Sequence, residues 1–509
     1  MTVLDDRDLW SLVARRASLS PDRVLVVDEH GREVTFAEFR LLAERAAAGL
    51  HALGVRQGTR VMWMLPTWIE SLVLSAALSR LGAIQVPLIP VYRQREIGFI
   101  ARQTSAPMML VPAVWRGTDY VDLATSATST MDKPPALITV DRSLPEGDPA
   151  TLPPPPAPPS RSDLRWIFYT SGTTSDPKGA KHSDATIAAS SWGMIEPWRL
   201  TDDDVMTLIF PYAHIGGVSL LIIALMAGNQ LIIVEAFDRT VVVDALTRYG
   251  VTLAGSGPAF WRAYIDAQQQ SEARLFPRLR LLIGGGAAKP ANMQRDARAV
   301  LGVDVVSGYG LTECPALVLN HSGDPDDVLA TDGRTMVGAE MRIVRLDGVV
   351  AEPNQDGEIQ VRGDMLFLGY LDEALDDDAL AGDGWLRTGD LGRMDARGQL
   401  TVAGRLKDVI IRKGENISAK EVEDVLIEHR DVRDVAVIGL PDDERGERCC
   451  AVAVPIDPAR PPTLDALVEH CIGAGLMRQK IPEQLEVVDA LPYNSTGKVL
   501  KADLRKRFQ

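Results

Sequence analysis

The sequence predicts an α/β fold in which a large N-terminal domain of layered α/β subdomains precedes a small α+β C-terminal domain. The chain has 509 residues, which is too long for a single hydrophobic core. Roughly its first 150 residues alternate short apolar strands with amphipathic helices, a pattern typical of parallel sheets covered by helices. Near residues 404–408, short strands with Gly-Asp turns give way to a strand–helix–strand pattern. We therefore predict domains at 1–404 and 405–509.

The first elements follow from apolar spacing and from capping residues. Val24–Asp28 is a short apolar strand. Thr35 precedes a run with apolar residues at helical spacing, and Glu38, three residues later, completes a capping box. Gly82 then ends an apolar helix. The strand, helix and strand expected in this region cover 60–65, 68–81 and 83–87.

Two segments in the middle of the chain have unusual compositions. Residues 153–159 read Pro-Pro-Pro-Pro-Ala-Pro-Pro, which excludes helix and central strand and favours a stiff polyproline II connector at the surface. We expect this connector to join two subdomains. The apolar run 218–234 is broken at 228–230, so it predicts a buried helix followed by a strand. It is shorter than the ~20 apolar residues that cross a bilayer.

The C-terminal elements are short and lie on both sides of the predicted boundary. Before the boundary we expect strands at 358–362 and 399–403. After it we expect a strand, a helix and a strand at 409–411, 419–429 and 435–439.

The overall charge argues against nucleic acid as a bulk partner. The chain has 54 Lys and Arg against 69 Asp and Glu, a formal charge of −15. Nucleic-acid binding relies on clustered basic side chains. A local basic pocket for a single nucleotide is still compatible with this balance.

The cysteines and the N-terminus predict a cytoplasmic protein without integral membrane association. The four cysteines have neither zinc-site nor disulfide-framework spacing. Thiols of this kind are typical of a reducing compartment. The N-terminus, Met-Thr-Val-Leu-Asp-Asp-Arg-Asp, is too acidic for a signal peptide.

Residues 169–180 read Tyr-Thr-Ser-Gly-Thr-Thr-Ser-Asp-Pro-Lys-Gly-Ala and predict a polyphosphate-binding loop. Glycines let backbone N–H groups approach phosphate, hydroxyls donate hydrogen bonds, and the lysine adds a positive charge. The loop is not a Walker A motif, because Lys178 precedes Gly179 and alanine follows. The candidate phosphate ligands are Thr170, Ser171, Gly172, Thr173, Thr174 and Lys178.

Six further segments complete a recognisable series of motifs. They are Pro211-Tyr-Ala-His-Ile-Gly-Gly217, Gly308-Tyr-Gly-Leu-Thr-Glu313, Trp385-Leu-Arg-Thr-Gly-Asp390, Gly404-Arg-Leu-Lys-Asp408, Arg412-Lys-Gly-Glu-Asn-Ile-Ser418 and Asn494-Ser-Thr-Gly-Lys498. In this order, from 169 to 498, the series resembles the adenylate-forming superfamily of acyl-CoA synthetases, peptide-synthetase adenylation domains and luciferases. Relatives commonly have glycine where this chain has Ser175, which puts the mobility of the phosphate loop in question.

The resemblance implies a fold and a nucleotide site. It implies a small β-barrel-like part in the N-terminal domain and a mobile C-terminal lid domain. Lys498 would bridge the substrate carboxylate and the α-phosphate of ATP, and Thr312 would contact the same phosphate. Glu313 would bind Mg²⁺, because a hard cation prefers carboxylate and phosphate oxygens.

The adenosine part of ATP would lie on a second group of residues. Tyr309, between Gly308 and Gly310, offers a flat face to adenine. Asp390 would accept hydrogen bonds from the ribose hydroxyls, with Arg405 beside it.

The resemblance also implies an acyl pocket and a coenzyme A tunnel. His214 would flank and gate the acyl group in a small, uncharged pocket formed by Gly216, Gly217, Ser256, Gly284 and Gly285. Lys407 would be the hinge between the domains. Gly414 would line the pantetheine tunnel, with Lys413 and Arg412 near the phosphates of CoA.

The predicted function is an acid:CoA ligase that uses ATP and Mg²⁺ to form an acyl-adenylate and then transfers the acyl group to coenzyme A. The pocket offers no cation for a second carboxylate and no aspartate for an amine, which favours a simple carboxylic acid. The phosphate-loop wording and Val91-Tyr-Arg-Gln-Arg-Glu-Ile97 resemble branches of the superfamily that act on fatty, alicyclic or steroid-degradation acids. The main alternative is an adenylating enzyme that passes the acyl group to a carrier protein or another acceptor. A P-loop NTPase and a catalytically silent nucleotide-binding regulator are further alternatives. A homodimer is compatible with the sequence.

Overall fold

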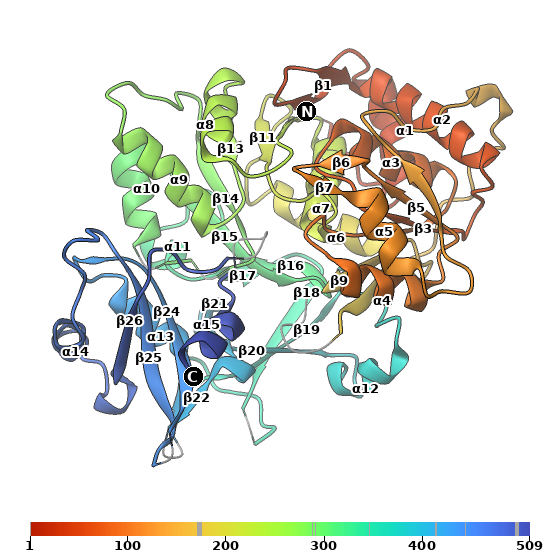
Figure 1. The fold of residues 1–509 in the computed structure, drawn as a ribbon. Helices are drawn as coiled ribbons and strands as arrows, with labels where there is room; N and C mark the ends of the chain where they lie inside the picture. The colour runs from red at the N-terminus through yellow and green to blue at the C-terminus, as the bar shows by residue number, and fades with distance from the viewer. Residues whose placement is uncertain are drawn as a thin grey trace.

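The computed structural model describes residues 2–170, 176–287, 289–290, 292–345, 347–412, 415–442, 444–493 and 498–509, with only the backbone of 415 and 416. Two large sheets form the part of the chain drawn in red to cyan in Figure 1, and a third sheet forms the blue C-terminal part. The molecule therefore has the large N-terminal and small C-terminal domains that the sequence predicts.

The largest sheet has thirteen strands in the order β18-β19-β20-β21-β17-β16-β15-β14-β13-β11-β12-β1-β2. Its parallel part consists of β1 (Val24–Asp28), β11 (Val205–Leu208), β12 (Gln230–Ile233), β13 (Leu253–Ala254), β14 (Leu281–Gly285) and β15 (Asp304–Leu311). The loops that follow β11, β13, β14 and β15 meet at one edge, where open α/β sheets usually bind ligands.

The other strands of this sheet are antiparallel. They are β2 (Glu33–Thr35), β16 (Cys314–Leu319), β17 (Gly333–Thr335), β18 (Ala339–Val344), β19 (Gly357–Gly363), β20 (Leu386–Met394) and β21 (Gln399–Arg405). Strands β16 to β21 form the section expected to be barrel-like, and the β15–β16 pair joins it to the parallel section.

The second sheet has six strands in the order β10-β9-β4-β3-β5-β8. They are β3 (Arg60–Trp63), β4 (Ile84–Pro87), β5 (Met108–Val111), β8 (Ala136–Thr139), β9 (Trp166–Thr170) and β10 (Lys178–His182), and a small hairpin is formed by β6 (Val114–Trp115) and β7 (Thr118–Asp119). The 153–159 connector is neither helix nor strand, as predicted. It links β8 to β9 of this same sheet, so the expectation that it joins two subdomains is wrong.

Helices cover the sheets and fill the space between them. The helices of the N-terminal domain are α1 (Leu9–Leu19), α2 (Phe36–Ala52), α3 (Ile69–Arg80), α4 (Gln94–Thr104), α5 (Tyr120–Thr128), α6 (Asp184–Ile195), α7 (Ile215–Ala227), α8 (Arg239–Arg248), α9 (Pro258–Gln269), α10 (Met293–Leu301), α11 (Asp326–Leu329) and α12 (Asp376–Ala379), with 3₁₀ turns η1 (Pro149–Thr151) and η2 (Glu373–Leu375). Helices α3 and α7 are buried almost throughout and share one apolar core with strands of both sheets.

Several local predictions are confirmed in this domain. Thr35 and Glu38 form the predicted capping box, with Thr35 N donating to Glu38 Oε2 at 2.8 Å and Glu38 N donating to Thr35 Oγ1 at 3.2 Å. The apolar run 218–234 forms most of α7 and then β12, separated by left-handed Gly228. None of the helices in the described ranges is long and apolar enough to cross a membrane.

The C-terminal domain is a five-stranded sheet with helices. Its elements are η3 (Leu406–Asp408), β22 (Ile410–Arg412), β23 (Glu415–Ile417), α13 (Ala419–Leu426), β24 (Val432–Asp442), β25 (Gly446–Pro455), α14 (Leu464–Gly473), η4 (Arg478–Lys480), β26 (Gln484–Val487) and α15 (Lys501–Phe508). The four cysteines are free and buried, and burial raises the pKa of the Cys471 thiol to about 11.

Candidate active site

The predicted phosphate loop connects two antiparallel strands. Thr170 ends β9 and lies opposite Lys178, which begins β10. Four of the predicted ligands, Ser171, Gly172, Thr173 and Thr174, lie outside the described residues, as does Ser175. The ammonium of Lys178 lies 5.2 Å from the centre of the Tyr370 ring. Lys178 is thus next to the aromatic residue that contacts the predicted metal ligand.

Glu313 follows β15 and is held by Tyr370. The Tyr370 hydroxyl donates a hydrogen bond to Glu313 Oε1 at 2.6 Å, and Glu313 is only 8% exposed. Burial and the charge of Glu313 raise the pKa of Tyr370, so the phenol keeps its proton and remains a donor. No sequence motif predicts this contact, because the two residues are 57 positions apart.

A buried histidine fixes the backbone beside Glu313. His182 Nε2 lies 2.8 Å from the Thr312 carbonyl oxygen, and His182 Nδ1 lies 2.9 Å from Thr186 Oγ1. Burial lowers the pKa of His182 to about 4, so the ring is neutral at pH 7. His182 therefore orients the Thr312–Glu313 turn without adding charge. Sequence reasoning missed this residue too.

Asp390 is the centre of a second polar group. The Tyr309 hydroxyl donates to Asp390 Oδ2 at 2.7 Å, and Arg405 Nε lies 3.1 Å from Oδ1. Asp390 and Arg405 face each other in the β20–β21 pair, and Asp390 is 6% exposed. The sequence placed these three residues in one site but did not predict that they bind one another.

The glycines of this region allow close backbone packing. A side chain at Gly308 would overlap the Val318 carbonyl across the β15–β16 pair, and one at Gly310 would overlap the Pro315 carbonyl. Strand packing therefore requires glycine at both positions, in addition to any role that these residues have in binding the nucleotide.

The predicted acyl-pocket glycines gather at the carboxyl ends of the parallel strands. Gly285 N donates to Ser256 O at 3.0 Å, which joins the ends of β13 and β14. Gly284 has a φ of +140° and leaves no room for a side chain against the Ser256 carbonyl. Gly217 packs in the same way against the backbone of Tyr212.

His214 caps the N-terminus of α7 beside these glycines. Its Nδ1 accepts a hydrogen bond from Gly216 N at 3.1 Å, and its ring meets Phe210 edge to face at 6.2 Å. Loss of solvent lowers the pKa of His214 to about 4, and the positive charge of Lys498 acts in the same direction. His214 is therefore neutral and lies within the field of the C-terminal lysine.

Lys498 comes from the C-terminal domain and lies among groups of the N-terminal domain. Loss of solvent is the largest cause that lowers its pKa, and the charge of Arg405 acts in the same direction. Asp390 and Glu313 oppose this effect. Because these charges act on one ammonium group, Lys498 shares a site with both carboxylates.

The predicted hinge residue lies between the two domains. Lys407 is in η3, directly after β21, and Asp408 beside it accepts a hydrogen bond from Arg505 Nη2 of α15 at 2.9 Å. Loss of solvent, followed by the charge of Arg405, lowers the pKa of Lys407.

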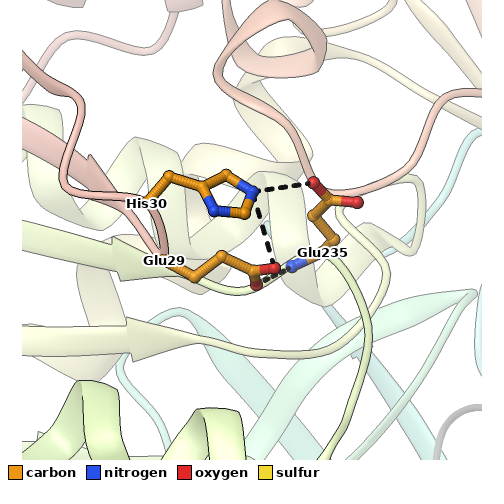
Figure 2. Close-up of side chains that lie close together, drawn as sticks. All are labelled: Glu29, His30 and Glu235. Atoms are coloured by element: carbon orange, nitrogen blue, oxygen red, sulfur yellow. Dashed lines mark hydrogen bonds and ion pairs between the residues drawn. The ribbon is translucent and has the colours of Figure 1, made fainter.

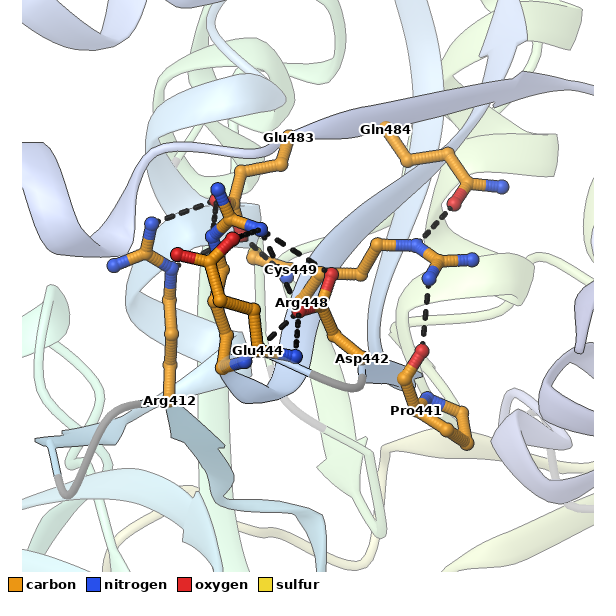
Figure 3. Close-up of polar contacts among 9 residues, drawn as sticks. Arg412, Pro441, Asp442, Glu444, Arg448, Cys449, Glu483 and Gln484 are labelled. Atoms are coloured by element: carbon orange, nitrogen blue, oxygen red, sulfur yellow. Dashed lines mark hydrogen bonds and ion pairs between the residues drawn. The ribbon is translucent and has the colours of Figure 1, made fainter.

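The predicted CoA residues can be compared with the structure only in part, because Lys413 and Gly414 lie outside the described residues. Arg412 precedes them and forms a two-pronged ion pair with Glu483, with distances of 2.6 and 3.0 Å. Figure 3 shows this pair within a larger polar network at the turn end of the β22–β23 hairpin. Arg412 is thus already neutralised, which makes it a weaker candidate for a CoA phosphate.

Another group of possible metal ligands lies after β1 and β12. His30 Nε2 is 3.6 Å from Glu235 Oε1 and 3.9 Å from Glu29 Oε1 (Figure 2). Arg142 also pairs with Glu235, and Trp115 Nε1 donates to its Oε2 at 3.0 Å. Because protein groups already neutralise Glu235, we do not assign a metal here.

Comparisons with known proteins cover nearly the whole chain. Residues 13–371 match the family model of the AMP-binding enzyme, and residues 421–498 match that of the AMP-binding enzyme C-terminal domain. The chain is 32% identical to a long-chain-fatty-acid–CoA ligase, FadD13, of Mycobacterium tuberculosis, over 99% of both chains. It is 33% identical to a salicyl-AMP ligase / salicyl-S-ArCP synthetase of the same species, over 97% of this chain and 90% of that one.

A solved structure extends the similarity to three dimensions. ATP-bound MatB from Rhodopseudomonas palustris superposes with a TM-score of 0.87 at 28% identity, over 98% of this chain and 99% of that one.

Proposed function

Given that this chain belongs to the AMP-binding enzyme family and is an ATP-dependent, AMP-forming acyl-CoA synthetase, we propose that it activates a fatty, alicyclic or steroid-derived carboxylic acid. The glycine-rich ends of β13 and β14 support an uncharged acyl pocket. The named activity of the fatty-acid relative supports an apolar acid.

In the first step a carboxylate oxygen of the acid attacks the α-phosphorus of ATP. A new P–O bond forms, the bond to the β-phosphate oxygen breaks, and pyrophosphate leaves with the electron pair. Both reactants are anions, so positive charge must be held where they meet. We assign this role to Lys498, which would contact the attacking carboxylate and an α-phosphate oxygen. The observation that carries the proposal is that Lys498 lies where the charges of Glu313 and Asp390, each held by its own hydrogen-bond partner, act on its ammonium group.

The other residues would bind and orient ATP. Thr170, Lys178 and the loop between them would hold the β- and γ-phosphates, and Thr312 would contact the α-phosphate. Asp390, held by Tyr309 and Arg405, would accept hydrogen bonds from the ribose hydroxyls on its remaining lone pairs. His214 would close the acyl pocket as a neutral side chain.

Glu313 fits the role of a magnesium ligand. The Tyr370 hydroxyl donates its hydrogen bond to Oε1 of Glu313. The other oxygen, Oε2, is therefore the one that would bind the cation. A carboxylate oxygen next to phosphate is the donor set that Mg²⁺ prefers. When bound, Mg²⁺ would neutralise charge on the phosphates.

In the second step the thiol of coenzyme A attacks the acyl carbonyl. A C–S bond forms, the bond to the AMP oxygen breaks, and the thiol proton is lost to solvent. The thiol must approach where Lys498 lies, so the C-terminal domain would rotate about Lys407. Gly414 and Lys413 would then reach the pantetheine and the phosphates.

A panel of carboxylic acids tests this function. With CoA, we expect release of AMP and pyrophosphate that depends on the acid, together with a thioester product. ADP release would contradict the assignment. Acyl-AMP that forms but is not consumed by CoA would favour a carrier-protein acceptor, as the name of the salicyl-AMP relative suggests for that protein.

A further inference from the structure

Helix α13 of the C-terminal domain meets the N-terminal domain at three separate places. The first is its N-cap residue. Ser418 Oγ donates a hydrogen bond to the carbonyl oxygen of Ala403, in β21, at 2.5 Å. The same Oγ accepts a hydrogen bond from Glu421 N at 3.2 Å. Ser418 therefore both caps α13 and joins the two domains. Ala403 and Ser418 lie on opposite sides of Lys407 along the chain.

The second place is a group of four charged side chains, two on the first turns of α13 and two in the N-terminal domain. Lys420 binds Asp424 of the same helix, with distances of 2.6 and 2.8 Å, and its side chain is only 15% exposed. Lys289 and Asp332 belong to the N-terminal domain, and Asp332 is bound to β21, the strand against which α13 packs. Asp332 accepts the Val402 N–H at 2.8 Å, and Lys289 Nζ lies 3.3 Å from the Thr331 carbonyl oxygen.

These four groups act on one another across the domain boundary. The charges of Lys420 and Lys289 both lower the pKa of Asp332 against the opposing and larger effect of burial. Burial lowers the pKa of Lys289 to about 8, while Asp332 raises it. Lys420 therefore favours the charged form of Asp332 across the domain boundary, whereas burial opposes it. Withdrawal of α13 would remove this effect.

The third place is the end of α13. Glu428 follows the helix and pairs with Arg295 of α10 at 3.1 Å. Both ends of α13 are thus fixed to the N-terminal domain. In Figure 1, α13 lies beside β21, which agrees with their packing.

Helix α13 also holds the segment that carries Lys498. Glu423 Oε1 lies 2.7 Å from Lys501 Nζ, three residues after Lys498, and accepts the Val437 N–H at 2.7 Å. The position of α13 is therefore transmitted to Lys498 by a short connection within the C-terminal domain.

We propose that α13 is a latch: its contacts through Ser418, Lys420 and Glu428 hold the C-terminal domain where Lys498 serves adenylation, and they must open before CoA can react. Lys420 and Glu428 are positioning residues, since they act through the domain and not on the substrates. This inference rests on the proposed function and adds the residues that set the balance between its two steps.

A reversible cross-link across the latch tests the proposal. The double variant Arg295→Cys/Glu428→Cys is joined with a short bis-methanethiosulfonate reagent, and the yield is measured by mass. The native cysteines are buried and should not react. We expect the linked enzyme to retain acid-dependent pyrophosphate exchange and to lose thioester formation from supplied acyl-AMP. A reductant should restore the second step.

A matched cross-link within the N-terminal domain serves as the control. Arg239 and Asp266 pair at 3.3 Å between α8 and α9, within the N-terminal domain and without crossing the hinge. Linked Arg239→Cys/Asp266→Cys should perform both steps normally.

Three outcomes would overturn the latch. They are failure of the two cysteines in Arg295→Cys/Glu428→Cys to link, unchanged thioester formation in the linked enzyme, and equal loss of both steps. If no acid supports AMP release by the unmodified enzyme, the proposed function fails instead. The cross-linking yield does not depend on that result.

Substitution of Lys420 provides a second test. Lys420→Met leaves Asp332 and Asp424 without their shared cation, and we expect pyrophosphate exchange to fall by about tenfold. Thioester formation from supplied acyl-AMP should be unchanged or faster, and Lys420→Arg should restore exchange. Lys133→Met removes an exposed lysine elsewhere and is the control. A parallel fall of both steps in Lys420→Met would indicate a merely structural role.

Discussion

At the scale of single residues, the site is built from polar groups that hold one another before any substrate binds. Tyr370 holds Glu313, Tyr309 and Arg405 hold Asp390, and His182 holds the Thr312 carbonyl. Each carboxylate is nearly buried, so an unpaired one would cost free energy that these partners offset. The partners thus fix the carboxylates in place for the cation and the ribose.

Lys498→Ala should separate the two half-reactions. Loss of the ammonium removes positive charge where the anions meet, so acid-dependent pyrophosphate exchange should fall by about 10²- to 10³-fold. Thioester formation from supplied acyl-AMP should continue, because Lys498 must leave for that step. Lys506→Ala, an exposed lysine on α15, is the control. Equal loss of both steps would contradict the assigned role.

Tyr309→Phe should weaken ATP binding. The substitution removes the hydroxyl that donates to Asp390 at 2.7 Å and leaves a buried carboxylate oxygen without its partner. A hydrogen bond to a charged group is worth about 1.5–3 kcal/mol, so we expect KM for ATP to rise by about tenfold or more. The KM for CoA should stay the same. An unchanged KM for ATP would remove Tyr309 from the nucleotide site.

At the scale of elements, the short 3₁₀ turn η3 between β21 and β22 carries the connection between the domains. Arg405, just before this turn, pairs with Asp390, and Asp408, its last residue, pairs with Arg505. Rotation of the C-terminal domain must therefore change backbone angles within a few residues around Lys407.

Lys407→Pro should stop this rotation. Proline fixes φ and also restricts the preceding residue, so the turn loses the freedom that a hinge needs. Pyrophosphate exchange should survive while thioester formation is lost, as followed by the two separate assays. Lys407→Ala removes the charge but leaves the backbone free, so it should perform both steps. Normal overall turnover of Lys407→Pro would exclude this residue as the hinge.

At the scale of the whole molecule, burial of neutral histidines makes stability depend on pH. Burial lowers the pKa of His182 from 6.5 to about 4. Between these values the unfolded chain binds a proton that the folded chain does not, so stability rises with pH across this window. The contribution of His182 should be complete above about pH 6.5 and amount to no more than about 3 kcal/mol.

The corresponding measurement is the thermal unfolding midpoint from pH 4 to 7. We expect the midpoint of His182→Gln to rise less steeply than that of the unsubstituted protein. Burial raises the pKa of Asp184 to about 7, so this carboxyl group acts in the opposite direction in both proteins. The difference between the two curves therefore isolates the histidine. Parallel curves would show that His182 also titrates normally when folded.

Much of the fold could be predicted because its signals are local. The Thr35–Glu38 capping box and the break at Gly228 both depend on residues a few positions apart. The composition of the 153–159 connector predicts extended chain for the same reason, whereas its place within a single sheet depends on strand pairing far along the chain.

The sequence by itself determined the family motifs, their order and the residue types that can bind ATP, because these are properties of short segments. Only the tertiary structure decided which groups meet. It placed Tyr370 on Glu313, His182 on Thr312, and Lys498 where its charge reaches His214 and where the charge of Asp390 reaches it. It also fixed α13 against the N-terminal domain. These contacts join residues far apart in sequence, and they arise from sheet order and domain docking, for which no short motif carries a signal.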